Sequence, residues 1–453
     1  MNLKAVYLRK KYWFNDFLHG SPMWKEFSEC MQIIENQYND IEGGGKIACL
    51  NKLLEFAKHN VPYYINNVHG DSLSDFPVVN KHIYLSDYES FCTPIDKIPG
   101  QKGKLHVQKT SGSTGTPFEV RQDTRCRLRR IAIIKAENEK IGFHSFEPMM
   151  HLRAVAHYWS DKRDYKYNED LNIWYVDNAN LNENKVLKII DIINAKKIKV
   201  VRGYMTTLDT ITQTMEEKNL KFNHKVTFIS VGELLQEKLR NRVVNYLHCD
   251  IISQYGNEEN GIFGQSDING SGLKINLNGA GCIIEILKLD KDEPVDLGEV
   301  GRIVVTDFTN YAFPMIRYEI GDLAAPHEYD THGFIKSIEN LSGRITDMIY
   351  CTNGQRLDFF NSLPAEIYNN LSIKQYQFVQ KDEKTYLLRL VVRDDKIKGN
   401  ESFFIDLLKK VLGDDAVITV EWLDEIPVLN SGKRKIVINE WNKEMNKSSS
   451  PNL

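Results

Sequence analysis

The chain has no stretch of ~18 or more consecutive apolar residues, although hydrophobic residues make up 42% of its 453 positions. A helix that crosses a bilayer needs about 20 predominantly apolar residues in a row. Residues 1–10 also lack an apolar core of signal-peptide length. We therefore expect no membrane span and a chain that starts without a secretory leader.

An excess of positive charge is missing as well. The sequence holds 58 Lys and Arg against 61 Asp and Glu, which gives a formal net charge of -3. Proteins that neutralise nucleic-acid phosphates usually carry a basic excess. The composition therefore predicts no nucleic-acid partner.

Cysteine is scarce and scattered. Seven cysteines lie at positions 30, 49, 92, 126, 249, 282 and 351. None is a close neighbour of another, so their spacing indicates neither a zinc knuckle nor a redox pair. The odd count and wide spacing are typical of a reducing compartment, and we expect a cytoplasmic protein.

A Walker A loop is absent, because no Gly-Lys pair in the chain is followed by Ser or Thr. Residues 110–116 instead contain only threonine, serine and glycine, and Pro117 follows them. Glycine lets a backbone turn and approach a ligand closely, and successive N–H groups and hydroxyls can cradle a phosphate chain. β-Branched and apolar residues flank the run, which predicts a hairpin around it. A flexible surface turn is the alternative for such a run. The candidate phosphate ligands are Thr110, Ser111, Gly112, Ser113, Thr114 and Gly115.

The order of periodic segments indicates an α/β protein. Residues 1–75 have mainly helical periodicity, interrupted at Pro62, where a helix should end. A further helix is predicted over 125–140. Helices of 10–15 residues then alternate with short strands over 183–253, which predicts a parallel sheet. Ligands of such sheets bind beyond the carboxyl ends of the strands, and the pairs Gly232-Glu233 and Tyr255-Gly256 lie there.

Six motifs resemble, in order, those of the adenylate-forming enzymes, the superfamily of acyl-CoA synthetases and adenylation domains. Phe118 follows the loop where many members have Lys, as in the branch that resembles phenylacetate–CoA ligase and the capsular-polysaccharide-biosynthesis-type ligases. The segments that carry the resemblance are 110–117, 254–259, 298–306, 317–322, 343–349 and 427–434.

The resemblance implies a nucleotide site. The backbone of Gly232-Glu233 would pack on adenine, and the ring of Tyr255, followed by Gly256, would stack on it. Glu259 would hold magnesium, since Mg²⁺ usually takes one or two carboxylates plus phosphate oxygens. Glu258 departs from the family pattern, which has a hydroxyl residue there.

Further residues follow from the same resemblance. Asp322, expected at a strand end, would accept from the ribose hydroxyls, and Arg344 would reach the ribose. Lys433 would reach the carboxylate and the α-phosphate during adenylation. Arg356 is a further candidate contact, in a segment that departs from the phenylacetate branch.

The resemblance implies two domains with different tasks. Residues 1–344 would form a large multi-sheet α/β adenylation domain, and residues 345–453 a small α+β lid that rotates about Thr346. With ATP and Mg²⁺, the enzyme would convert a carboxylic acid to acyl-AMP and release pyrophosphate. It would then transfer the acyl group to a thiol, with coenzyme A as one candidate co-substrate, or to an amine.

Two alternatives stay open. One is a nucleotide-binding relative without catalysis; the other is a coenzyme-A-independent amide ligase that acts on a sugar or polysaccharide precursor. The oligomeric state is also open, with a homodimer as one option. Trp159, Tyr158 and His157 are weak candidates for the acyl pocket.

Overall fold

The computed structural model describes residues 2–39, 44–109, 118–154, 164–179, 181–344, 347–357, 364–368, 370, 372–393, 395–427 and 434–441. The chain divides into two compact units. Unit 1 comprises Met1–Leu235 and Leu239–Leu341, and unit 2 comprises Gln236–Lys238 and Ser342–Leu453. The assignment of an adenylation task to one part and a lid task to the other stays a prediction.

Unit 1 begins with helices, as the periodicity predicts. Buried Asp16, near the end of α1, accepts the backbone N–H groups of Met23 and Trp24, each at 2.9 Å, and so caps the next helix. Pro62 begins a new helix directly after the one that ends at Asn60, because proline fits the first turn, where its missing N–H has no helical partner. These helices are α1 (Leu3–Leu18), α2 (Pro22–Asn39), α3 (Gly44–Asn60), α4 (Pro62–Asn67) and α5 (Lys81–Ser86).

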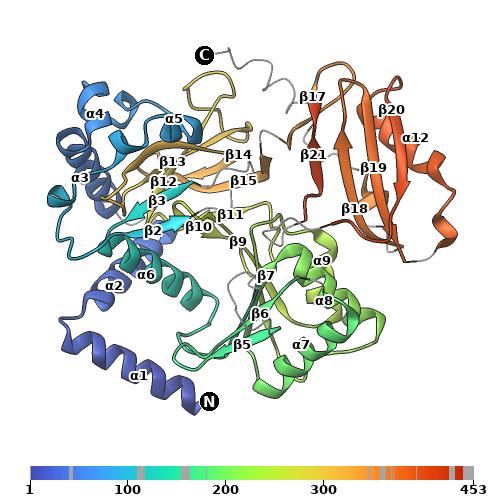
Figure 1. Ribbon diagram of the computed structural model, residues 1–453, viewed down its shortest axis with the longest axis horizontal. Helices are drawn as coiled ribbons and strands as arrows, with labels where there is room; N and C mark the ends of the chain where they lie inside the picture. Colours follow the sequence, from blue (N-terminus) through green and yellow to red (C-terminus); the bar gives the residue numbers. More distant parts are fainter. Residues whose placement is uncertain are drawn as a thin grey trace. The chain divides into compact units, whose positions relative to one another are not determined.

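A 13-stranded sheet forms the framework of unit 1 (Figure 1). Its strand order is β12-β13-β14-β15-β11-β10-β9-β8-β7-β4-β6-β5, with β1 paired to β14. The strands of its first half along the chain are β1 (Val79–Asn80), β4 (Met149–Arg153), β5 (Tyr165–Asn168), β6 (Ile173–Asp177), β7 (Val200–Tyr204), β8 (Thr227–Val231) and β9 (Asp250–Asn257). The others are β10 (Gly261–Gln265), β11 (Ile275–Leu277), β12 (Cys282–Leu287), β13 (Gly301–Asp307), β14 (Met315–Tyr329) and β15 (Ile335–Arg344).

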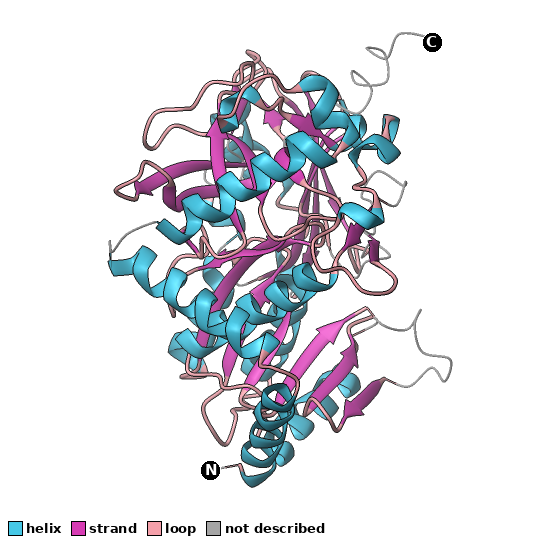
Figure 2. Cartoon of the chain, turned by 90° about the vertical axis from the view of Figure 1, so that its left-hand side faces the viewer, coloured by secondary structure: helices cyan, strands magenta, loops and turns pink. Residues whose placement is uncertain are grey.

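The parallel sheet predicted over 183–253 is confirmed, since β7, β8 and β9 pair parallel in turn. The parallel part extends further than predicted, because β4 pairs parallel with both β7 and β6. The connecting helices include α7 (Glu183–Lys196), α8 (Met205–Glu217) and α9 (Glu237–Asn241), and they gather beside β5, β6 and β7 in Figure 1. The predicted antiparallel region is also confirmed, since β12, β13 and β14 pair antiparallel in turn. Figure 2 shows helices of unit 1 lying across the strands.

The predicted helix over 125–140 is confirmed as α6 (Thr124–Lys140). The side chain of Asp123 accepts from the N–H of Cys126 at 2.7 Å and fixes its start. Its buried residues include Ala132, Ile133 and Ala136, which pack in one core cluster with residues of α2. The helix is therefore held in place from both its end and its apolar side.

Unit 2 is a small α+β domain, as predicted. Its four-stranded sheet has the order β20-β19-β18-β21, and the predicted hairpin is the antiparallel pair β18 and β19. Phe378, Tyr386, Leu388 and Phe404 are among its buried core residues. The elements are β16 (Ile349–Tyr350), β17 (Arg356–Leu357), α11 (Ala365–Tyr368), β18 (Ile373–Gln380), β19 (Thr385–Val392), α12 (Glu401–Leu412), β20 (Val417–Trp422) and β21 (Val437–Asn439).

Among the described residues, none of the helices has both the length and the hydropathy needed to cross a membrane.

Candidate nucleotide-binding site

The predicted hairpin around the Ser/Thr/Gly run is confirmed. Strands β2 (His106–Lys109) and β3 (Glu119–Gln122) pair antiparallel, and Lys109 lies opposite Glu119. The loop residues Thr110, Ser111, Gly112, Ser113, Thr114 and Gly115 themselves lie outside the described residues. The two ends of the loop are thus held side by side, and the role of the loop stays a prediction.

The acidic pair occupies a tight turn between two antiparallel strands. β9 ends at Asn257 and β10 begins at Gly261, so Glu258 and Glu259 lie in the turn that joins them. A Cβ atom at Gly256 would lie 2.2 Å from the carbonyl oxygen of Gly261. Only glycine therefore lets the two strands approach this closely before the turn.

The base of the Ser/Thr/Gly loop touches this acidic turn. Gln108, two residues before the loop, donates from Nε2 to Oε2 of Glu258 at 2.9 Å. The hydrogen bond joins residues 150 positions apart in the sequence. The structure thus brings together two segments that the sequence identified separately, and it engages the carboxylate of Glu258 rather than that of Glu259.

Arg130 of α6 binds the backbone of the acidic turn. No sequence motif identified this residue. Its guanidinium donates to the backbone carbonyl oxygens of Glu258, at 3.5 Å, and of Glu259. It also pairs with the carboxylate of Asp307 at 3.1 Å, and the two side chains are only 13% and 1% exposed. Asp307 in turn accepts from the N–H and Oγ1 of Thr309 at 2.8 and 2.6 Å. A buried ion pair therefore fixes the backbone of the predicted metal-binding turn.

Tyr255 and Asp322 come together although 67 positions separate them. The Tyr255 hydroxyl donates to Oδ2 of Asp322 at 3.0 Å, and the Tyr255 ring meets the ring of Phe263 edge-on at 5.3 Å. The two residues predicted to bind adenine and ribose are thus neighbours. Both side chains are partly exposed.

The expectation that Asp322 ends a strand is wrong. Asp322 lies inside β14, which continues to Tyr329. In the pairing with β13, Glu319 lies opposite Val304 and Leu323 lies opposite Arg302. Four residues of β14 therefore span the same stretch as two residues of β13, which is a bulge. Gly321 in this bulge has φ = +85°, a conformation that suits glycine. The bulge, rather than a strand end, presents the Asp322 carboxylate.

Glu233 has a structural contact of its own. Its carboxylate accepts from the backbone N–H of Thr206 at 2.8 Å and from the Thr206 hydroxyl at 3.2 Å. Helix α8 has no side-chain cap from Tyr204, its own N-cap residue, so Glu233 supplies one and places a negative charge at the helix N-terminus. Gly232, at φ = +71°, makes the turn that directs Glu233 there. The predicted contact of their backbone with adenine stays a prediction.

For most of the remaining predicted site residues, the side chains lie outside the described part of the structure. Arg344 is the last residue of β15, and its side chain lies outside the described residues, as do Lys433, Thr346, His157, Tyr158 and Trp159. Arg356 begins β17 in unit 2 and is exposed. Lys435, two residues beyond Lys433, pairs with both oxygens of Asp347 at 3.0 and 2.9 Å.

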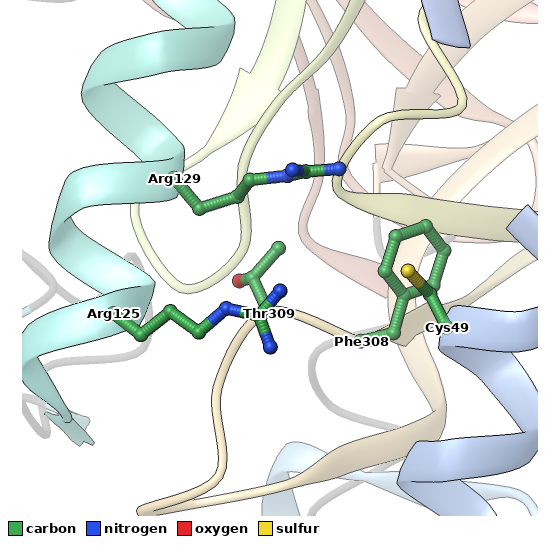
Figure 3. A pocket seen from close by; sticks show the side chains of 5 residues that line it. All are labelled: Cys49, Arg125, Arg129, Phe308 and Thr309. Atoms are coloured by element: carbon green, nitrogen blue, oxygen red, sulfur yellow. The ribbon is translucent and has the colours of Figure 1, made fainter. Parts of the chain in front are cut away.

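A small cavity lies elsewhere, between α3, α6 and the segment after β13 (Figure 3). Cys49, Arg125, Arg129, Phe308 and Thr309 line it, and it offers about 10 Å³ to the centre of a water molecule, which is room for about one water. Buried Nη2 of Arg129 has no partner among the described residues. The cavity suits a water and is too small for a nucleotide.

The described residues are compatible with a magnesium ion that takes most of its ligands from phosphate oxygens and water. Among them, no group of three or more His, Cys, Asp and Glu could hold a metal alone. Mg²⁺ is usually held by one or two carboxylates together with substrate phosphates and water. One carboxylate, at Glu259, would supply the protein's share of such a donor set, and its role as the metal ligand stays a prediction.

Solved structures share this architecture over most of the chain. A 2-hydroxyisobutyryl-CoA ligase in the postadenylation state, in complex with R3-HIB-AMP, matches with a TM-score of 0.65 at 15% identity, over 89% of this chain and 91% of that chain. The chain has the fold of the adenylate-forming ligases. Anthranilate CoA ligase AuaEII, in complex with anthranoyl-AMP, matches with a TM-score of 0.52 at 14% identity, over 76% of this chain and 67% of that chain.

Sequence comparisons match the chain to CapK proteins. Residues 356–440 match the family described as the CapK C-terminal domain. Protein CapK of Staphylococcus aureus is 21% identical over 438 residues, which cover 92% of this chain and 91% of that protein. The resemblance drawn from the six motifs and the predicted fold class are therefore confirmed.

Proposed function

We propose that this protein is an ATP-dependent, AMP-forming ligase. It activates a carboxylic acid as acyl-AMP with release of pyrophosphate, and then transfers the acyl group to coenzyme A or to an amine. The fold shared with ligases that hold acyl-AMP supports this proposal.

The observation that carries the proposal is the hydrogen bond between the side chains of Tyr255 and Asp322. The Tyr255 hydroxyl lies 3.0 Å from the Asp322 carboxylate, so a side chain whose ring can stack on a base is next to a group that can accept from ribose hydroxyls. Tyr255 lies near the end of β9. The acidic turn follows directly after this strand and contacts Gln108 at the base of the Ser/Thr/Gly loop. One short region therefore offers groups for a base, a ribose, a metal and a phosphate chain.

The chemistry explains why these groups suffice. A carboxylate resists acyl transfer because oxide is a poor leaving group. Attack of a carboxylate oxygen on the α-phosphorus of ATP forms acyl-AMP and expels pyrophosphate, and AMP then leaves readily when a thiol or amine attacks the carbonyl carbon. The protein mainly has to position the reactants and offset charge.

Each residue has a task in this scheme. The loop from Thr110 to Gly115 would hold the β- and γ-phosphates, and Tyr255 and Asp322 would hold the nucleoside. Glu259 would hold Mg²⁺, which when bound neutralises phosphate charge. Arg130 acts through the turn and is a positioning residue.

Residues of the C-terminal part complete the proposal. Lys433 would offset the charge that builds on the α-phosphate as the carboxylate attacks, and Arg344 would contact the ribose. The lid would then turn about Thr346 and admit the acceptor. Arg356 is proposed as a contact for a second substrate, and domain motions of this kind often limit turnover.

The acceptor has two candidates. A 2-hydroxyisobutyryl-CoA ligase of the same fold has been solved in complex with 2-HIB-AMP and CoA, with a TM-score of 0.52, which supports coenzyme A. The similarity to protein CapK, together with the capsule-type motifs, supports an amine on a sugar or polysaccharide precursor. We place the reaction in the cytoplasm.

Carboxylate-dependent exchange of pyrophosphate into ATP tests the proposal. We expect exchange with part of a carboxylic-acid panel, both with and without coenzyme A. Asp322→Asn should weaken ATP binding about tenfold, because hydrogen bonds to charged groups contribute about 1.5–3 kcal/mol. Tyr255→Phe is the matched control, since it removes the same Tyr–Asp bond but keeps the carboxylate and the ring. ATP binding without exchange for any acid would instead indicate a nucleotide-binding protein without catalysis.

A further inference from the structure

A row of polar side chains crosses the parallel part of the sheet in unit 1. The register of β4 with its neighbours places His151 beside Tyr175 of β6 on one side and beside Arg202 of β7 on the other. Paired residues of adjacent strands project from the same face, at a strand spacing of about 4.8 Å. The rings of His151 and Tyr175 lie 6.0 Å apart, as this register requires. Tyr175, His151 and Arg202 therefore form one continuous polar row.

Five arginines of unit 1 with well-buried side chains have carboxylate partners. The pairs are Arg129 with Glu26, Arg130 with Asp307, Arg242 with Asp209, Arg302 with Glu319, and Arg317 with Glu285. Each of these arginine side chains is at most 13% exposed. This is the usual arrangement, because a desolvated charge is costly unless it is paired.

Arg202 departs from that arrangement. It is partly buried on β7, an interior strand of the sheet, and its guanidinium makes no ion pair or hydrogen bond with any residue the structure describes. Burial lowers the pKa of Arg202 to about 10, the charge of Glu258 opposes this, and Arg153 adds to it. Arg202 thus stays charged at neutral pH, and no described residue occupies its donors.

The neighbour of Arg202 supplies no compensating charge. Burial, together with Arg202 and then Arg153, lowers the pKa of His151 to about 3, so its imidazole is neutral at pH 7. The carboxylate that acts on Arg202 most strongly is that of Glu258, in the acidic turn of the candidate site, where it accepts from Gln108. The row therefore presents one fixed positive charge and a neutral hydrogen-bonding ring on β7 and β4, and β7 lies two strands from β9, which leads into the acidic turn.

We propose that Arg202 receives a second carboxylate of the acyl substrate, so that the preferred substrate is a dicarboxylic acid of which one carboxyl group is adenylated. This inference rests on the proposed function. The planar guanidinium matches a carboxylate with two parallel hydrogen bonds. His151 beside it offers one further hydrogen bond. Arg202 is thus a specificity-determining residue for the substrate rather than part of the adenylation chemistry.

Paired acids that differ by one carboxyl group test the inference. Succinate is compared with butyrate, glutarate with valerate, and phthalate with benzoate, each in the pyrophosphate-exchange assay. For the parent protein we expect kcat/KM to be about 10- to 100-fold higher for the diacids, the range that a hydrogen-bonded charge contributes. Arg202→Gln should remove this preference and leave the monoacids within about threefold, and Arg202→Lys should restore part of it.

Two further measurements distinguish a direct contact between Arg202 and the substrate carboxylate from a long-range electrostatic effect and from a role of Arg202 in stability. Arg153→Gln is the matched control, because it removes the same charge from the exposed end of β4, two residues beyond His151. It should keep the preference for diacids. Arg202→Gln should unfold at the same temperature as the parent or higher, since a partly buried charge without an ion pair to a described residue adds no stability to the folded state.

Several outcomes would overturn the inference. Equal loss with Arg153→Gln, equal loss for monoacids and diacids, or a clear fall in the unfolding temperature of Arg202→Gln would each do so. Equal use of both acid classes by the parent would overturn it while the proposed function stands. Failure of every acid to support exchange would overturn the proposed function, and this inference with it.

Discussion

The buried pair of Arg130 and Asp307 gives a prediction whose size follows from the structure. Arg130→Met leaves the Asp307 carboxylate, which is 1% exposed, without its cation. Breaking a buried pair on one side costs about 3–5 kcal/mol. Asp307 keeps two hydrogen bonds from Thr309, so we expect the lower end, about 3 kcal/mol. The acidic turn also loses its donor to the Glu259 carbonyl, and the Mg²⁺ requirement for pyrophosphate exchange should rise.

Urea unfolding followed by circular dichroism measures the first effect, and a magnesium titration of exchange measures the second. Arg125→Met is the matched control on the same helix. Arg125 is 43% exposed and pairs with Glu26, so its loss should cost less than about 1 kcal/mol. Adding Asp307→Asn to Arg130→Met should recover part of the stability, as expected of a coupled pair. Equal urea midpoints for the parent and Arg130→Met would refute the reasoning.

Three further predictions concern single ionisable groups. Glu259→Gln should raise the Mg²⁺ concentration needed for half-maximal exchange, whereas Glu258→Gln should not; the reverse result would move the metal ligand by one position. Burial raises the pKa of Glu137 from 4.5 to about 7, so the folded protein keeps a proton that the unfolded chain releases, and stability is lost as the pH rises through this range. Urea unfolding should therefore show Glu137→Gln about 3 kcal/mol more stable than the parent at pH 8 and equal to it near pH 4.5; parallel pH profiles would contradict this. Lys433→Ala should slow adenylation about 10²–10³-fold yet preserve acyl transfer from supplied acyl-AMP, whereas Lys435→Ala should keep both half-reactions; comparable loss of both in Lys433→Ala would assign that lysine a structural role.

Local pattern was sufficient to predict much of the framework. Alternation of strands and helices predicted the parallel pairing of β7, β8 and β9, because helical crossovers between short strands leave few other topologies. Turn residues between β-rich flanks likewise predicted the β2–β3 hairpin. These features depend on residues that are near one another in the sequence.

Features that depend on distant registers could not be predicted in the same way. The bulge at Gly321 exists because of how β14 pairs with β13, and no periodicity within β14 reveals it. Arg130 looks like an ordinary charged helix residue until α6 is packed against the β9–β10 turn. Arg202 and the carboxylate of Glu233 are similar cases, since their meaning depends on which strands lie beside them.

The fate of ATP tests the central claim most directly. The protein is incubated with ATP, Mg²⁺ and the carboxylic-acid panel in the absence of any acceptor, and the products are identified by mass spectrometry. The account predicts an acyl-AMP whose mass follows that of the acid, together with pyrophosphate. Acid-dependent formation of ADP and phosphate, or no nucleotide product with any acid, would contradict it.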